Sequence, residues 1–125
     1  MSKLVRSIKE SMSNLTQNSE GSLTADFTFS KGFLGFNGHF PNKPIVPGVC
    51  KIQAAMLMFE EAKKKSFTLK EIVLAKFFSP VSCDEKVTFT IKEEPGIGEE
   101  ILAKIVVGNE KKIAELHLRI ESLAK

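Results

Sequence analysis

The 125-residue sequence predicts a single α+β domain, over residues 1–125, in which a curved and mostly antiparallel sheet wraps one long helix. Three observations indicate this fold class. The segment 49–59 is apolar on nearly every side, which is typical of a buried core helix. About five other segments carry strand patterns, and short hairpin-like connections join some of them. The composition, 42% hydrophobic and 26% charged, is that of an ordinary globular chain and excludes a disordered or fibrous one.

The amino-terminal part predicts one helix, one strand and a long irregular segment. Apolar residues at helical spacing indicate a short amphipathic helix, namely Leu4, Val5, Ile8 and Met12, and a polar segment follows at residues 14–21. Residues 22–30 alternate between apolar and polar side chains with a period of two, which predicts a half-buried strand. Residues 32–48 contain four of the eight glycines and three of the five prolines, which excludes regular structure there.

From residue 49 onward the pattern predicts the buried helix and then four strands. The helix ends in three lysines that complement the negative end of its dipole and that we expect to be solvated, Lys63, Lys64 and Lys65. Strand patterns occupy residues 72–78, 87–91, 101–107 and 113–120, with PGIG and GNEKK as the hairpin-like connections. In the last strand the step from Ala114 to Leu116 indicates a bulge or a register shift.

Composition also excludes several classes of function. The ten phenylalanines are the only aromatic residues, so a pocket would be lined by hydrocarbon and phenyl groups and would favour an apolar ligand. A net charge of +3 is too small and too scattered to indicate nucleic-acid binding, although it suits an acidic partner. Cys50 and Cys83 lack the spacing of zinc ligands, which excludes metal and disulfide scaffolds. With no secretory signal and no apolar run of ~20 residues, we expect a cytoplasmic protein without a membrane span.

The segment 38–49, GHFPNKPIVPGV, is the most informative part of the chain. Its prolines, Pro41, Pro44 and Pro47, fix φ at three places, so the loop should hold a defined shape before any ligand binds. Gly48 opens the buried helix, whose first amides have no intrahelical partner and can bind a carbonyl oxygen as it gains charge. A base close to such donors could remove the proton α to a thioester.

His39 lies in this loop and is one of two histidines in the chain. Its side chain titrates near neutral pH, so the residues alone leave two interpretations open: a hydrogen-bonded structural histidine or a catalytic base. His117 lies on the polar side of a predicted strand together with Glu115 and Arg119. We therefore expect His117 to face solvent.

The segment GHFPNKPIVPGV resembles the signature G-H-F-P-x-x-P-x-x-P-G-V of the β-hydroxyacyl-(acyl-carrier-protein) dehydratases, the hotdog-fold thioester dehydrases of fatty-acid synthesis. The later segment AKFFSPVSCDEKVTF is similar to a strand pair of the same family, and the resemblance covers roughly residues 22–121. It implies a hotdog fold and a homodimer with active sites at the subunit interface. It implies no cofactor and no metal.

The resemblance also assigns the site residues. In the family the motif histidine acts on the α-carbon proton, and a carboxylate on the central helix of the other subunit assists the loss of water. His39 matches the histidine, and Gln53 stands where the family has the acid. An amide can orient a hydroxyl but cannot deliver a proton, and Glu60 and Glu61, which we expect to be solvated, lie ~10 Å further along the helix. The expected substrate-binding residues are Phe36, Gly38, Phe40, Pro47, Gly48 and Val49.

Three functions follow as hypotheses. The first is dehydration of β-hydroxyacyl thioesters, carried on acyl carrier protein or coenzyme A, to enoyl thioesters. The second, motivated by Gln53, is a catalytically weak subunit that binds an acyl thioester or partners an active paralogue. A thioesterase is less favoured, because the proline-rich histidine loop is the dehydratase pattern. An acidic carrier would meet a positive rim, with ordinary solubilising lysines as the alternative, for which the candidates are Lys31, Lys43, Lys51 and Lys76.

Overall fold

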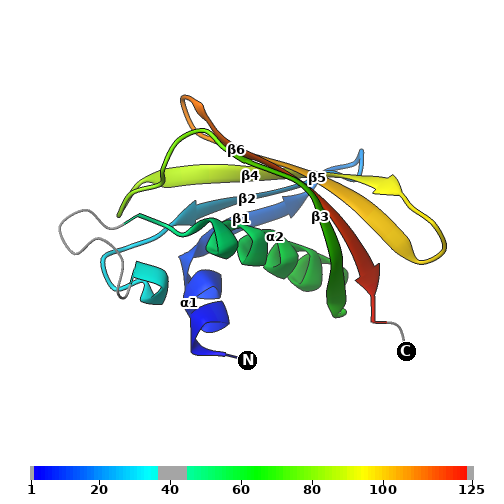
Figure 1. The fold of residues 1–125 in the computed structure, drawn as a ribbon. Helices are drawn as coiled ribbons and strands as arrows, with labels where there is room; N and C mark the ends of the chain where they lie inside the picture. The colour runs from blue at the N-terminus through cyan, green and yellow to red at the C-terminus, as the bar shows by residue number, and fades with distance from the viewer. Residues whose placement is uncertain (1, 37–44, 124–125) are drawn as a thin grey trace.

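A computed structural model describes residues 2–36 and 45–123, in which a long helix packs against a curved, six-stranded antiparallel sheet (Figure 1). The elements are α1 (Lys3–Ser11), β1 (Met12–Gln17), β2 (Leu23–Thr28), the 3₁₀ turn η1 (Leu34–Phe36), α2 (Gly48–Lys63), β3 (Phe67–Phe77), β4 (Lys86–Pro95), β5 (Glu100–Gly108) and β6 (Lys112–Ser122). The strand order is β1-β2-β4-β5-β6-β3. The α+β prediction is confirmed, and the arrangement is the hotdog fold that the motif implied. No helix in the described part of the chain is long and apolar enough to cross a membrane.

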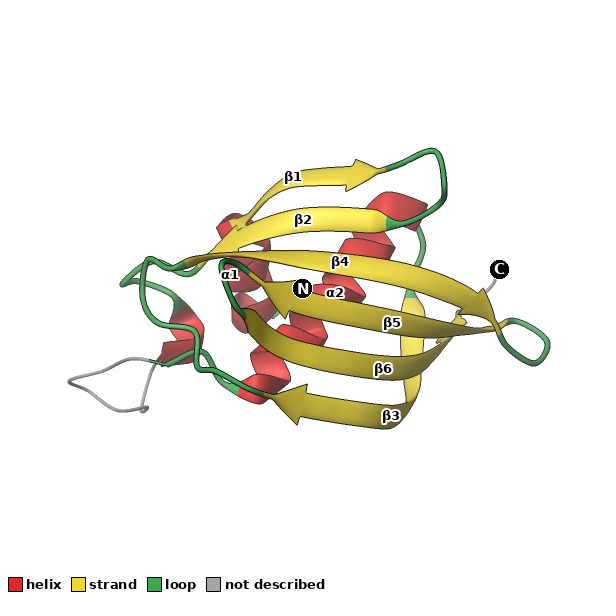
Figure 2. Cartoon of the chain, turned by 90° about the horizontal axis from the view of Figure 1, so that it is seen from above, coloured by secondary structure: helices red, strands yellow, loops and turns green. Residues whose placement is uncertain are grey.

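Helix α2 runs beneath the concave face of the sheet (Figures 1 and 2). Its buried residues point in nearly all directions, which confirms the expected core helix: Cys50, Lys51, Ile52, Ala54, Ala55, Leu57, Met58 and Phe59. The helix ends where Lys64 adopts a left-handed conformation, φ 58°, and donates its N–H to the Glu60 carbonyl at 2.9 Å. Lys64 and Lys65 are exposed as expected, whereas Lys63 is half-buried and forms an ion pair with Glu93 at 2.9 Å.

Phenylalanine rings connect the sheet with the segment that precedes α2. Phe27 of β2 packs on Phe89 of β4 with ring centroids 4.7 Å apart. Phe29 continues the row to Phe33 at 4.6 Å, and Phe33 meets Phe36 of η1 edge-on at 5.2 Å. All five side chains are buried. The phenyl-rich interior expected from the composition therefore extends from the sheet to η1.

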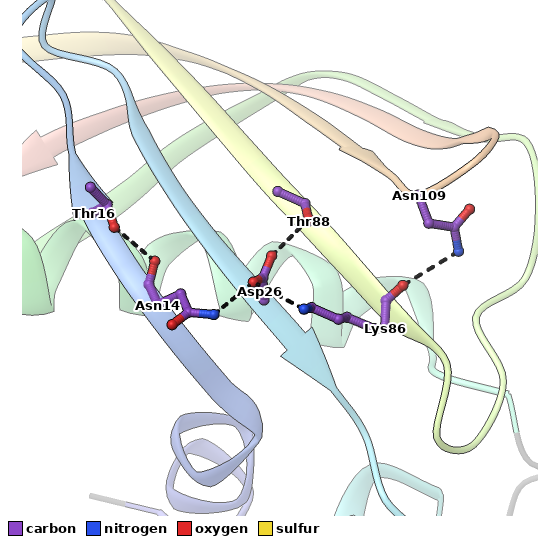
Figure 3. Close-up of polar contacts among 6 residues, drawn as sticks. All are labelled: Asn14, Thr16, Asp26, Lys86, Thr88 and Asn109. Carbon is purple, nitrogen blue, oxygen red and sulfur yellow. Dashed lines mark hydrogen bonds and ion pairs between the residues drawn. The ribbon is translucent and has the colours of Figure 1, made fainter.

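Strand β1 is an element that the sequence pattern missed, because four of its six side chains are polar and exposed and only Met12 and Leu15 pack against the core. Its pairing with β2 is interrupted between Ser13 and Thr16, and Asn14 has a left-handed φ of 57°. That conformation lets the Asn14 side chain donate to Asp26 Oδ2 at 2.9 Å, while Thr88 Oγ1 donates to Asp26 Oδ1 at 2.7 Å (Figure 3). Lys86 Nζ lies 3.6 Å from the same carboxylate. Asp26 of β2 thus joins β1 and β4 through polar contacts.

A register irregularity occurs in β6, next to the place that the sequence indicated. Val107 of β5 pairs with Ala114, but Gly108 pairs with Lys112, so the extra residue is Ile113. The expected position, between residues 114 and 116, was wrong by one residue. Ile113 and Ala114 are consecutive and both buried, so the alternation breaks between these two residues. The Ile113 carbonyl accepts two N–H donors from the segment that follows β3, Phe78 at 2.8 Å and Ser79 at 3.2 Å. The irregularity therefore fixes that segment to the sheet.

Strand β3 forms one edge of the sheet and is exposed on both faces. Apart from Leu74, every residue from 70 to 77 is exposed, including Ile72 at 47%, Val73 at 51% and Phe77 at 48%. Two register shifts in its pairing with β6 leave Lys70 and Val73 without partners there. An edge strand with apolar side chains and unpaired backbone groups is a template for association with another chain.

Candidate active site

The start of α2 presents unbonded backbone donors. Pro47 occupies the N-cap position and provides no side-chain cap, while the Cys50 N–H donates to the Pro47 carbonyl at 3.0 Å. The amides of Gly48 and Val49 have no backbone acceptor within residues 2–36 and 45–123. They lie at the positive end of a 16-residue helix, and Val49 is 59% exposed. These two N–H groups can bind a ligand oxygen that carries or develops negative charge.

Gly48 lies at a close approach between α2 and the end of β3. A Cβ atom built on Gly48 would lie 2.9 Å from Cζ of Phe77 and 3.2 Å from its Cε2. The absence of a side chain therefore allows the Phe77 ring to lie directly over the first turn of the helix. Residues far apart in the sequence meet here, and the ring forms a wall beside the free amides.

A pocket of about 530 Å³ opens at this point, which we call the α2 pocket. Its lining is mostly apolar and comes from the start of α2 and from the segment after β3: Ile45, Val46, Pro47, Gly48, Lys51, Phe77, Phe78, Ser79 and Pro80. The two segments are joined by the Val46 N–H, which donates to the Val81 carbonyl at 2.9 Å, and by an isolated bridge between Ile45 and Ser82. The pocket thus has walls held by backbone hydrogen bonds. Its apolar character agrees with the ligand class expected from the composition.

Lys51 lies in the α2 pocket, where the sequence did not place it. We expected a lysine on the surface rim, but the side chain is only 3% exposed, because Phe77 and the 45–47 segment cover it. Its Nζ donates to the Val46 carbonyl at 3.2 Å and lies 5.3 Å from the centre of the Phe77 ring. Burial lowers the pKa of this ammonium. Of the other rim candidates, Lys31 and Lys76 are exposed, and Lys43 lies outside the described residues.

Gln53 lies on α2 two residues after Lys51. Its Oε1 atom is buried and has no hydrogen-bond partner within the described residues, so it can accept a hydrogen bond from a ligand. The glutamates that follow it are half-buried and engaged rather than solvated, which corrects our expectation. Glu60 Oε2 accepts the Phe67 N–H at 3.0 Å, and Glu61 forms an ion pair with Lys9 at 3.3 Å. Neither carboxylate is available to replace an acid at position 53.

Some of the other expected site residues are described by the structure and some are not. Phe36 is buried in η1, and this turn lies against the start of α2, since a Cβ on Gly35 would be 3.0 Å from the Cys50 sulfur. Pro47 and Gly48 line the α2 pocket, whereas Phe36, Val49 and Gln53 are not among its lining residues. The remaining three, Gly38, His39 and Phe40, lie outside the described residues.

The second histidine and the cysteines offer no competing chemistry. His117 Nε2 lies 3.3 Å from Glu115 on β6, and its side chain is 24% exposed, so it is more covered than expected. Burial raises the pKa of the Cys50 thiol, which keeps it protonated and unreactive. No group of three or more His, Cys, Asp or Glu side chains in the described part of the chain could hold a metal ion.

Comparison with known structures supports the fold. The "Dehydratase Heterocomplex ApeI:P" from Xenorhabdus doucetiae superposes with a TM-score of 0.77 at 16% identity, over 88% of this chain and 96% of that chain. The PaaI protein from the Escherichia coli phenylacetic acid degradation operon gives a TM-score of 0.62 at 15% identity, over 82% of this chain and 73% of that one. At these identities the likeness shows the fold alone.

Comparison of sequences identifies the family. The protein described as 3-hydroxyacyl-[acyl-carrier-protein] dehydratase FabZ, from Clostridium tetani, is 35% identical over 73% of this chain and 68% of its own length. The family model described as ApeI dehydratase, ApeI-like, matches residues 15–115. Both matches include the loop with His39 and the start of α2 in the region of the motif. The chain therefore belongs to the ApeI-like dehydratase family of hotdog proteins.

Proposed function

We propose that this chain removes water from β-hydroxyacyl thioesters carried on acyl carrier protein, in fatty-acid-type biosynthesis. One observation carries the proposal: the amides of Gly48 and Val49, which have no backbone acceptor among the described residues, lie beside an apolar pocket of about 530 Å³ that can hold an acyl chain. The relative from Clostridium tetani is named for this class of substrate. Coenzyme A is the alternative carrier, and the cytoplasmic location stays a prediction.

In the proposed reaction His39 takes the α-proton, and the electrons of the broken C–H bond move onto the thioester carbonyl oxygen. The amides of Gly48 and Val49 stabilise that oxygen because they are aligned with the positive end of α2. When the enolate collapses, the α,β double bond forms and the β-carbon to oxygen bond breaks, so hydroxide departs and takes up the proton held by His39 to give water, which returns His39 to its neutral form. Gln53 orients the β-hydroxyl through its buried amide oxygen but supplies no proton.

The test follows the reverse reaction, hydration of an enoyl thioester, by ultraviolet absorbance. We expect His39→Ala to lower the rate by roughly 10²-fold or more, because a positioned base contributes about that much. His117→Ala is the matched control, since it removes the other histidine from a position on β6 next to Glu115, and it should leave the rate unchanged. Equal rates for wild type and His39→Ala would refute the catalytic assignment.

We further propose that the working unit is a homodimer associated along β3. The exposed apolar side chains of Ile72 and Val73 support this, because they lie on a strand that pairs only with β6 in the sheet that the structure describes. Phe77 at the end of β3 lies over the start of α2, so association along this edge would bring a second subunit close to the α2 pocket. Such a dimer would be isologous, with the same patch used by both subunits.

A second candidate function is a catalytically weak acyl-thioester-binding subunit. Gln53 favours it, because the described carboxylates that follow on α2, Glu60 and Glu61, are engaged elsewhere and leave the site without an acid. The structural relative from Xenorhabdus doucetiae is described as a heterocomplex, which shows that a protein of this fold associates with a different chain. For a binding subunit, the hydration assay would show no dependence on His39.

A further inference from the structure

The α2 pocket contains a cation that no side-chain carboxylate of the chain neutralises. Lys51 is 3% exposed, and within the described residues its ammonium contacts a carbonyl and a ring but forms no ion pair. The segments outside the description, residue 1, residues 37–44 and residues 124–125, contain no Asp or Glu. No side-chain carboxylate of this chain can therefore serve as the counter-ion, so one would have to come from outside the chain, from a bound ligand or from a second subunit.

The position of Lys51 makes the uncompensated charge more unfavourable. It is the fourth residue of α2, in the first turn, where the helix dipole favours anions and disfavours cations. An ammonium has three N–H donors, and Val46 accepts from only one of them, at 3.2 Å. An apolar side chain of similar length would fill the same volume without these costs. The arrangement has the properties of a receptor for an anionic oxygen.

We propose that the α2 pocket binds free carboxylic acids with an apolar body, with the carboxylate held by Lys51 and the amides of Gly48 and Val49. The apolar body then lies against Phe77 and the other hydrocarbon walls of the pocket. Free acids therefore compete with acyl thioesters for one site, and this part of the inference rests on the proposed function. A carboxylate is preferred over a neutral thioester, because only the carboxylate supplies the missing negative charge.

Binding is measured by calorimetry with octanoate, and with octanamide as the neutral molecule of the same shape. Charge-assisted hydrogen bonds are stronger than neutral ones, so we expect octanoate to bind wild type at least ~10-fold more tightly than octanamide. Lys51→Met should reduce this preference to about one, without lowering the melting temperature. Lys76→Met is the matched control, because it removes an exposed lysine beside Phe77 that does not line the pocket, and it should keep the preference.

Equal binding of octanoate and octanamide to wild type would overturn the inference, whatever preference the variants show. A preference that survives in folded Lys51→Met would overturn the assignment to Lys51. In the hydration assay, octanoate should inhibit competitively and octanamide should not. If wild type shows no hydration activity but keeps the Lys51-dependent preference, the proposed function fails and the carboxylate site stands. If wild type is active in the hydration assay but shows no preference for octanoate over octanamide, the carboxylate site fails and the proposed function stands.

Discussion

Gln53→Glu replaces an amide by a carboxyl group of the same shape at the one position where the family has an acid. The Gln53 amide oxygen is buried without a described partner, and burial raises the pKa of a carboxyl placed there. Such a group remains protonated closer to neutral pH, which is the form that can donate to a departing hydroxide. A positioned general acid contributes roughly 10²- to 10⁴-fold, or about 3 to 5 kcal/mol of barrier, so we expect a gain of at least ~10²-fold.

The assay is enoyl-thioester hydration between pH 5 and pH 8, with thermal melts of the same samples. A folded-state pKa above the unfolded value near 4.3 costs stability as pH rises past 4.3, so Gln53→Glu should melt closest to wild type at low pH. Gln53→Ala is the steric control and should show no gain. The reasoning is refuted if folded Gln53→Glu is no faster than wild type while wild type still depends on His39. If His39→Ala also changes nothing, the acyl-binding function replaces the enzymatic one.

Two further predictions concern stability and assembly. Hydrogen bonds from Asn14 and Thr88 hold the pKa of Asp26 below its usual 3.8, so its stabilising contribution is present above that pH and is lost as pH falls through the lowered value. Asp26→Asn should therefore be less stable than wild type at pH 7 in urea unfolding, the difference should shrink as pH falls below 3.8, and a constant difference would contradict this. Val73→Lys should give a monomer in light scattering, whereas Val106→Lys, at a similarly exposed valine of β5, should stay dimeric. A monomeric wild type, or a dimeric Val73→Lys, would exclude association along β3.

Period-two alternation predicted the strands that have one face on α2 and one in solvent, which are β2, β4, β5 and β6. It placed the start of β3 at residue 72 rather than at Phe67, because most of this strand is exposed on both faces and has no alternation to detect. Strand β1 was missed for a related reason. Only two of its six side chains, Met12 and Leu15, pack against the core, and the backbone pairs and the hydrogen bond from Asn14 to Asp26 leave no hydrophobic pattern.

The sequence indicated the start of α2 as part of the site but not the side chains that reach it from elsewhere. Pro47 and Gly48 could be identified because proline and glycine restrict or free the backbone locally. Phe77 comes to Gly48 only through the pairing of β3 with β6, which no local pattern encodes. Lys51 was assigned to the surface because lysines are rarely buried. Its burial results from residues that cover it in the folded chain, Phe77 and the 45–47 segment. The signal that was available is that Lys51 is the single charged residue of the mostly apolar segment 49–59.

The order of the strands also determines when the site can form during synthesis. Within the described sheet β3 has no neighbour other than β6, which the ribosome makes last of all the strands. Phe77 pairs with Ala114, so its ring cannot be fixed over α2 until β6 has emerged. At ~5–20 residues per second, the nascent chain carries an unpaired apolar β3 for a time on the order of seconds. Chaperones that shield this strand should therefore raise the yield of folded protein more than those that act after release.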